Sequence, residues 1–261
     1  MREWNAASYH RISNPMFAMA MPVLQRLPLR GDELVVDLGC GSGLVTEKLL
    51  ERLPSGRVIA IDISMNMLVA AREHLQAAHG HHVSYLLADG AMLPLHGIAD
   101  AVFSTATFHW VLDHPALFAG LFGALKPGGR LVAQCGGGPN IERLHDRAAA
   151  LMRAPEFVPY YASWRDPWEF ADPDITRRRL EAAGFTAIVT SIEPVPVIHS
   201  DAEAFGTYLT NIICRHHLSY LPTRDLQQRF IDALTRMAAA DAVPYELDYW
   251  RLNIEAMRPA W

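Results

Sequence analysis

The ten residues "LVVDLGCGSG" at 34–43 constrain the fold more than any other stretch of the chain. The apolar run stops at Gly39, and Gly41 and Gly43 follow before the helical pattern "LVTEKLLERL" begins. This order predicts a buried strand, a tight turn and the start of a helix. Glycine permits positive φ and close approach to the backbone, and the N–H groups of a helix N-terminus attract polar groups. We therefore expect a ligand at this turn.

Further apolar runs alternate with helical patterns through the first half of the chain. The runs predicted as strands are 34–38, 57–61, 83–87, 100–105 and 130–135. One helix between them is bounded by Ser64, a candidate N-cap, and Gly80, while another ends at Pro127. Such alternation is typical of a doubly wound α/β fold with a parallel sheet.

The second half has a less regular pattern. We expect a helix over 141–152, an aromatic and proline-rich stretch, a helix near 172–185, a β-rich segment at 186–198, helices within 203–240 and a last strand at 245–257. There is no internal repeat and no low-complexity linker, which favours elaborations of one domain over a second independent one.

Composition excludes several classes of function. The 261 residues carry a formal charge of −5, without the basic balance of nucleic-acid binders. Three cysteines, Cys40, Cys135 and Cys214, are isolated, so neither a disulfide framework nor a zinc cluster is predicted. The N-terminus lacks a signal-peptide pattern and no apolar run is long enough to span a bilayer. We expect a cytoplasmic protein that binds no metal, nucleic acid or membrane.

The glycine spacing discriminates between nucleotide-like ligands. A nicotinamide dinucleotide site has the fingerprint G-x-G-x-x-G, but Leu44 stands where its third glycine belongs. Asp62 ends the second strand, where a carboxylate accepts hydrogen bonds from a ribose diol in either ligand class. Asp89 follows the third strand at the same sheet edge, where an acceptor can meet the amine of an adenine.

Four segments together resemble the successive motifs of class I S-adenosylmethionine-dependent methyltransferases. They are "VDLGCGSG", "AIDIS", "LLADGAMLPL" and "LKPGGRLV", in the order and at the spacing of that family over residues 34–133. The resemblance implies a mostly parallel seven-stranded, Rossmann-like sheet with a helical cap. It also implies a single domain over 1–261, with a donor-binding core at about 30–139, 172–198 and 244–257, and cap elements at 1–29, 140–171 and 199–243.

The same resemblance assigns the positions that bind the methyl donor, S-adenosylmethionine. It implies that Asp62 binds the ribose hydroxyls, that Ile63 packs on the adenine, and that Asp89 with Gly90 reads the adenine edge. The other implied donor-binding residues are Asp37, Gly39, Cys40, Gly41 and Gly43 in the first motif, Thr105 at the end of the fourth strand, and Tyr9 in the N-terminal arm.

A second likeness concerns the methyl acceptor. The block "HWVLDH", Gln134 and the opening "WNAASY" resemble trans-aconitate methyltransferase and related enzymes that esterify carboxylates of small molecules. The triple glycine at 136–138 departs from the pattern of that group. The likeness implies a small organic acceptor, with carboxylate O-methylation as the first hypothesis.

The acceptor determines which catalytic residues are needed. A carboxylate is nucleophilic as it stands and needs only positioning, whereas a phenol, alcohol, carbon or amine acceptor calls for a general base. His109 is the candidate for base or hydrogen-bond donor, and the candidate substrate contacts are Trp110, Tyr160, Arg165 and Arg215. A donor-binding protein without turnover and a dehydrogenase are the remaining alternatives. The identity of the acceptor and the oligomeric state stay open.

Overall fold

The computed structural model describes residues 14–260, and the chain divides into two compact units. Unit 1 consists of the residues up to Gly138, Trp168–Ile192 and the residues from Arg251 onward. Unit 2 consists of Pro139–Pro167 and Glu193–Trp250.

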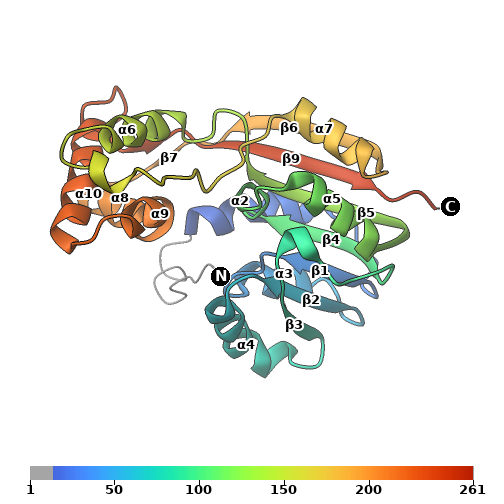
Figure 1. The fold of residues 1–261 in the computed structure, drawn as a ribbon. Helices are drawn as coiled ribbons and strands as arrows, with labels where there is room; N and C mark the ends of the chain where they lie inside the picture. Colours follow the sequence, from blue (N-terminus) through green and yellow to red (C-terminus); the bar gives the residue numbers. More distant parts are fainter. Residues whose placement is uncertain (1–13, 261) are drawn as a thin grey trace. The chain divides into compact units, whose positions relative to one another are not determined.

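Unit 1 is built on a seven-stranded sheet with the order β3-β2-β1-β4-β5-β9-β6 (Figure 1). The strands are β1 (Leu34–Leu38), β2 (Arg57–Asp62), β3 (Val83–Leu87), β4 (Ala99–Thr105), β5 (Leu125–Gly136), β6 (Thr186–Pro194) and β9 (Trp250–Met257). The strands from β3 to β5 pair in parallel, and β9 pairs antiparallel with β5. The predicted α/β fold with a mostly parallel seven-stranded sheet is confirmed.

Helices cover both faces of this sheet. They are α2 (Asn14–Arg26), α3 (Leu44–Leu50), α4 (Met65–His79), α5 (His114–Ala124) and α7 (Pro173–Ala182), with short 3-10 helices η1 (Gly90–Met92) and η2 (Phe108–Trp110). Side chains of α2, α3 and α4, such as Leu24, Leu49 and Leu68, form one apolar cluster with the sheet. Leu117 of α5 and Leu180 of α7 belong to a second cluster. The two clusters make the three-layer arrangement of a doubly wound fold.

The local start and stop signals act largely as the sequence predicts. Ser64 caps α4, and its hydroxyl accepts from the Met67 amide at 3.4 Å. The helix that the sequence predicts to end at Pro127 ends at Ala124, because the backbone of Leu125 is extended (φ −71°, ψ 146°) and begins β5. The first boundary of the expected cap also differs, since α2 belongs to unit 1 and buries Val23 and Leu24 in the core.

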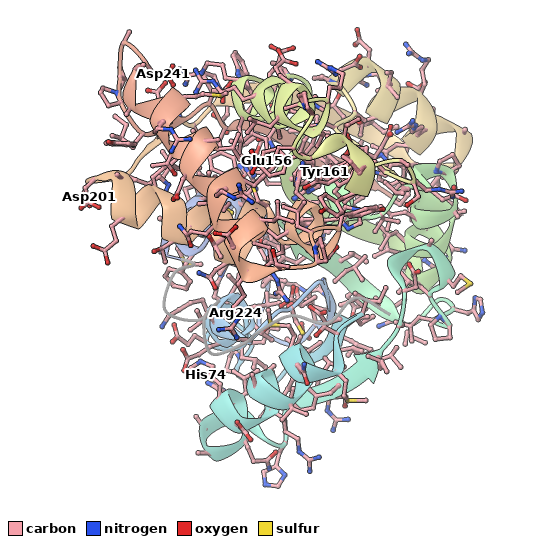
Figure 2. The ribbon with its side chains drawn as sticks, turned by 60° about the vertical axis from the view of Figure 1, so that its left-hand side comes forward. His74, Glu156, Tyr161, Asp201, Arg224 and Asp241 are labelled. Atoms are coloured by element: carbon pink, nitrogen blue, oxygen red, sulfur yellow. The ribbon has the colours of Figure 1, made fainter. Side chains whose placement is uncertain are left out.

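Unit 2 is mostly helical. Its elements are α6 (Glu142–Met152), η3 (Val158–Tyr160), α8 (Ala202–Tyr208), a π-helical turn η4 (Leu209–Ile213), α9 (Arg215–Ser219), α10 (Arg224–Ala239) and the antiparallel pair β7 (Val197–Ile198) and β8 (Glu246–Leu247). Ion pairs connect its helices to adjoining loops: Arg229 of α10 pairs with Glu156 at 2.7 Å, and Arg147 of α6 pairs with Asp241 at 2.5 Å. Figure 2 labels both carboxylates.

The strand expected at 186–198 is interrupted in the structure. β6 ends at Pro194, and β7 resumes at Val197 in a different sheet. Pro194 and Pro196 explain the break, because proline has no amide hydrogen to donate to a strand ladder. The last expected strand divides likewise into β8 and β9. Within residues 14–260, no helix combines the length and apolarity required to cross a bilayer.

Candidate active site

The loop between β1 and α3 is fixed to β2 by its backbone. The amides of Gly39 and Cys40 donate to the carbonyl of Ile61 at 2.7 and 3.0 Å. Gly39 has φ +78°, and a Cβ at this position would lie 1.9 Å from the Thr107 hydroxyl oxygen. Only glycine fits here, because any side chain would be both strained and in collision.

Gly41 has a different environment from Gly39. Its φ is +55°, but a Cβ at Gly41 would meet no atom within 4 Å. Its amide donates to Asp62 Oδ2 at 3.0 Å, and the Ser64 amide donates to Asp62 Oδ1 at 2.9 Å. A carboxylate oxygen can accept more than one hydrogen bond, so Asp62 is held in place and can still accept from a ligand. The loop therefore presents open backbone beside an oriented carboxylate.

A pocket opens at the carboxyl ends of β1 and β4. It encloses about 470 Å³, including the part open to solvent. It is lined by the predicted residues Asp37, Gly39, Cys40, Gly41 and Thr105, together with Met16, Phe17, Ser42, Leu44, Val45 and Ala106. Five predicted donor-binding residues thus share one concave site.

Asp37 lies in the wall of this pocket with its side chain 2% exposed. Burial raises the pKa of its carboxyl to about 6, and the nearby Asp62 charge acts in the same direction. The Thr46 hydroxyl donates to Asp37 Oδ2 at 2.6 Å, which favours the ionised form. The pocket therefore holds a carboxyl whose ionisation a bound cation would favour.

The carboxyl end of β3 presents Asp89 and Gly90. Asp89 is half-buried and caps η1, since its Oδ1 accepts from the Ala91 amide at 2.9 Å. Gly90 is buried, and a Cβ there would lie 3.3 Å from Val111 Cγ2. Ile63 follows Asp62 and is half-buried. These predicted residues occupy the ends of the adjacent strands β2 and β3, as the parallel pairing requires.

The turn after β4 holds His109 rigidly. Its side chain is 8% exposed, and its Nδ1 accepts from the Gly136 amide at 3.2 Å. An amide N–H can only donate, so His109 Nδ1 accepts this bond with its lone pair. The proton of the neutral ring therefore lies on Nε2. In this tautomer His109 offers a hydrogen-bond donor at Nε2. It does not offer the lone pair that a general base needs.

The backbone of the same turn is held by residues from distant parts of unit 1. His114 Nε2 donates to the carbonyl of Phe108 at 3.1 Å, and Arg179 donates to His114 Nδ1 at 2.8 Å. Arg179 also pairs with Glu169 at 2.9 Å, and the Glu169 amide donates to the His109 carbonyl at 2.9 Å. Burial and the Arg179 charge lower the pKa of His114, which keeps its ring neutral. We name His114, Arg179 and Glu169 the turn brace.

Trp110 lies in an aromatic cluster beside His109. Its ring centroid is 5.3 Å from His109 and 5.6 Å from Trp168, and Trp168 stacks on Phe170 at 5.6 Å. Trp110 is half-buried. The cluster gives His109 an apolar surrounding.

The other predicted substrate contacts belong to unit 2. Tyr160 ends η3 and is half-buried, and Arg165 is exposed, with its carbonyl accepting from His216 at 3.1 Å. Arg215 begins α9, and burial lowers the pKa of its guanidinium.

Tyr9, which the resemblance implies as a donor-binding residue, lies outside the described residues. Residues 14–260 contain no group of three or more side chains arranged to hold a metal ion.

Sequence reasoning missed several residues of this region. Met16 and Phe17 line the pocket from α2, and Thr107 packs against Gly39. An apolar stripe at Ala20, Val23, Leu24 and Leu27 has the spacing of a core helix and was the available signal for α2. The turn brace has no local signal, because its members are brought together only by packing.

Comparisons with known proteins agree with this geometry. Residues 36–133 match a family model described as a methyltransferase domain. A trans-aconitate 2-methyltransferase of Paracidovorax citrulli is 39% identical over 168 residues, covering 64% of this chain and 60% of the relative. An uncharacterized methyltransferase of Schizosaccharomyces pombe is 31% identical over 186 residues, covering 70% of both chains. The chain thus spans less than two thirds of the trans-aconitate relative's length.

Solved structures share the fold. A putative methyltransferase of Bacillus halodurans has a TM-score of 0.63 at 16% identity, covering 93% of this chain and 99% of the other. A phosphoethanolamine N-methyltransferase of Haemonchus contortus in complex with S-adenosylhomocysteine has a TM-score of 0.62 at 17% identity, covering 97% of this chain and 57% of the other. With the fold, the glycine loop and the relatives in agreement, the chain belongs to the class I S-adenosylmethionine-dependent methyltransferases.

Proposed function

We propose that this chain is an enzyme that transfers the methyl group of S-adenosylmethionine to a carboxylate oxygen of a small organic acid. Family membership supports the donor, and the trans-aconitate relatives support an acid as acceptor. The observation that carries the choice of acceptor is the Gly136 hydrogen bond to His109 Nδ1. This bond leaves His109 Nε2–H as a hydrogen-bond donor. Such a group suits a carboxylate as methyl acceptor, because a carboxylate has no proton for a base to remove.

The pocket fits the donor in the proposed assignment. Gly41 lacks any neighbour that a Cβ would meet within 4 Å, so a ligand can approach its backbone. Asp62, held by two amides, accepts from the ribose hydroxyls, and Asp89 accepts from the adenine amine. Asp37 balances the charge of the methionine part. Thr105 and Ala106 border the sulfur end.

The donor supplies a methyl group already activated by a sulfonium. A carboxylate oxygen attacks that carbon, the carbon–sulfur bond breaks and its electron pair stays on sulfur, giving a methyl ester and S-adenosylhomocysteine. No proton moves, so the protein has to hold the two reactants in line and exclude water. Such positioning is worth roughly 7–11 kcal/mol in well-oriented systems. His109 Nε2–H positions the acceptor, and the turn brace positions His109.

The test is an incubation with methyl-labelled S-adenosylmethionine and a panel of small acids that includes trans-aconitate, beside phenols, alcohols and amines. The proposal predicts label in an acid product that mild base releases, since esters hydrolyse under those conditions. A second arm uses His109→Gln, whose amide keeps a donor, and His109→Ala. Turnover reduced in Ala and retained in Gln fits a donor role. Label only in base-stable products, with both variants inactive, would overturn carboxylate methylation.

A further inference from the structure

Ala106 has a backbone conformation that residues other than glycine rarely adopt. Its φ is +55°, in the left-handed region, where a Cβ is strained. Three other described residues besides the glycines have a positive φ, namely Ile141, Ala187 and Tyr245, but none of them lines the donor pocket, whereas Ala106 does. Strained backbone persists only where its surroundings fix it, and it clusters at functional sites.

The turn that starts at Ala106 is attached to β5 at two points. The Ala106 amide donates to the Gln134 carbonyl at 2.8 Å, and His109 Nδ1 accepts from the Gly136 amide at 3.2 Å. Gln134 and Gly136 lie two residues apart in the same strand. A change of backbone conformation at Ala106 would therefore change where the His109 ring meets β5.

Thr107 makes hydrogen bonds on both sides of its own position in this turn. Its hydroxyl donates to the Thr105 carbonyl at 2.9 Å, and its own carbonyl accepts from the Trp110 amide at 2.9 Å. The first bond spans the strained residue Ala106, and the second closes η2, which carries His109. Thr107 thus connects the strained backbone to the residue that faces the acceptor in the proposed function.

The Thr107 side chain also contacts the glycine loop. A Cβ at Gly39 would lie 1.9 Å from Thr107 Oγ1 and 2.5 Å from its Cγ2, so both atoms lie directly against the Gly39 backbone. Gly39 and Thr105 line the same pocket, one from the loop after β1 and the other from the end of β4. Because Thr107 contacts the first and bonds to the second, it connects two walls of the donor pocket.

We infer that Thr107 is a positioning residue for methyl transfer, which holds the strained turn at Ala106 so that the sulfur end of the donor pocket and the His109 ring keep one fixed separation. This inference rests on the proposed function for the place of the sulfur end, but it applies to any methyl acceptor. In-line displacement needs the reacting atoms at a defined distance, and a misplacement of about 1 Å can cost on the order of 100-fold in rate. The bonds around Thr107 fix this geometry in advance of the reaction.

The test compares wild type with Thr107→Val, Thr107→Ser and Ala106→Gly. Valine keeps the shape of threonine without the hydroxyl, serine keeps the hydroxyl, and glycine adopts a positive φ without strain. Two controls make the same changes elsewhere in unit 1. Thr186→Val removes a hydroxyl that donates to the Met257 carbonyl at 3.4 Å, and Ala187→Gly relieves a φ of +49° at an exposed position of β6.

Three properties are measured for every variant. The first is the unfolding temperature. The second is kcat and acceptor KM with trans-aconitate, or with whichever acid, phenol, alcohol or amine the labelled-donor panel shows to be methylated. The third is the pair of ¹⁵N signals of the His109 ring in the complex with S-adenosylhomocysteine, assigned with His109→Gln. These signals report the tautomer without any turnover, because a protonated and an unprotonated ring nitrogen differ in chemical shift.

The inference predicts that Thr107→Val lowers kcat about 3- to 10-fold, the range for one lost hydrogen bond, with acceptor KM within about twofold of wild type. Thr107→Ser should retain at least about half of the wild-type kcat. Ala106→Gly should also lower kcat, while its unfolding temperature stays equal or rises because glycine relieves the strain. A merely structural role would lower stability and kcat together. Both controls should leave kcat unchanged.

The ring signals provide the second prediction. In wild type the two His109 ring nitrogens should give well-separated signals, as one fixed tautomer requires. In Thr107→Val and Ala106→Gly the signals should move towards each other, because the ring is no longer held in one position against β5 and exchanges between tautomers.

A wild-type kcat or wild-type ring signals in the folded variants Thr107→Val and Ala106→Gly would overturn the inference, as would an equal loss of kcat in the two controls. If Thr107→Val fails to fold, Ala106→Gly decides. The proposed function fails separately. A methylated phenol or amine would refute carboxylate methylation, and the kcat comparison would be made with that acceptor. If the panel contains no acceptor that is methylated, the ring signals alone decide.

Discussion

The two halves of the candidate site in unit 1 are built in different ways. At the ends of β1, β2 and β3, backbone amides of the strand–turn segments make the hydrogen bonds, some to near residues, such as Ser64 to Asp62, and some to the neighbouring strand, such as Gly41 to Asp62 over 21 positions. At the turn after β4, side chains take part: the His109 ring accepts from Gly136 of β5, and Arg179 of α7 donates to His114 of α5 over 65 positions. The glycine loop thus depends on adjacent strand–turn motifs, whereas the turn after β4 depends on side chains packed from other elements.

Because of this difference, changes elsewhere in the fold affect the geometry of the two regions unequally. A local motif keeps its shape while the rest of the fold varies, because its backbone bonds and glycines specify it. A turn held by α7 and β5 changes when either element shifts. In the proposed assignment, the turn after β4 is therefore the region whose geometry can change while the glycine loop stays the same.

The largest expected effect distinguishes two glycines of one loop. Gly39→Ala places a Cβ 1.9 Å from the Thr107 hydroxyl at φ +78°, and should lower the free energy of unfolding by about 3–4 kcal/mol. Gly41→Ala, with φ +55° and open space around it, should cost only about 1 kcal/mol but weaken S-adenosylhomocysteine binding. Urea unfolding and calorimetry measure the two quantities. Equal destabilisation by both variants would contradict this account of the loop.

A second prediction concerns the pH dependence of Asp37. Burial raises its pKa from 3.8 to about 6, so the folded state binds this proton more tightly than the unfolded state. Its contribution to stability is therefore complete below about pH 4 and is lost as the pH rises through 6. Asp37→Asn keeps an oxygen for Thr46 and should be about 2–3 kcal/mol more stable than wild type at pH 7, with no gain at pH 4.

Urea unfolding between pH 4 and pH 8 checks this prediction. Asp100→Asn is the control of opposite sign, because the Lys126 ammonium and the Leu34 amide hold the pKa of Asp100 below its usual value. That variant should lose stability at pH 7. Parallel profiles for wild type and Asp37→Asn would contradict a raised pKa of Asp37 in the folded state.

The smallest expected effect concerns the turn brace. Arg179→Met removes the donor to His114 Nδ1 and should lower kcat about 3- to 10-fold, with unchanged S-adenosylhomocysteine affinity. Arg178→Met, an exposed neighbour on α7, should have no effect. Without the Arg179 charge the pKa of His114 rises, so the acid limb of the kcat profile should also move to higher pH. An unchanged kcat and profile would assign the brace no part in positioning His109.

Much of unit 1 could be predicted because its signals are local. The apolar runs located β1 and β3 with their observed bounds, and Ser64 marked the start of α4. The family resemblance of one strand-turn-helix segment implied Asp37 and Gly41, and both line the pocket.

The rest depends on contacts that a single sequence does not reveal. Arg179 reads as part of the charged run "TRRRLEAAG", and only its packing against α5 selects it from Arg177 and Arg178. Arg251 is one of three polar residues of β9, with Asn253 and Glu255, and only the fold shows that it is buried in register with Gly136. Pro194 and Pro196 divide one strand that hydropathy alone predicts as continuous, and the last expected strand is interrupted at Asp248 and Tyr249, where the sequence has no proline.

A calorimetric titration of wild type and Gly41→Ala with S-adenosylhomocysteine and, separately, with a nicotinamide dinucleotide tests whether this loop binds the methyl donor. We expect one site for S-adenosylhomocysteine in wild type, an affinity at least tenfold weaker in Gly41→Ala, and no binding of the dinucleotide. Absence of S-adenosylhomocysteine binding, or equal binding by the folded Gly41→Ala variant, would contradict the assignment of this loop as the donor pocket.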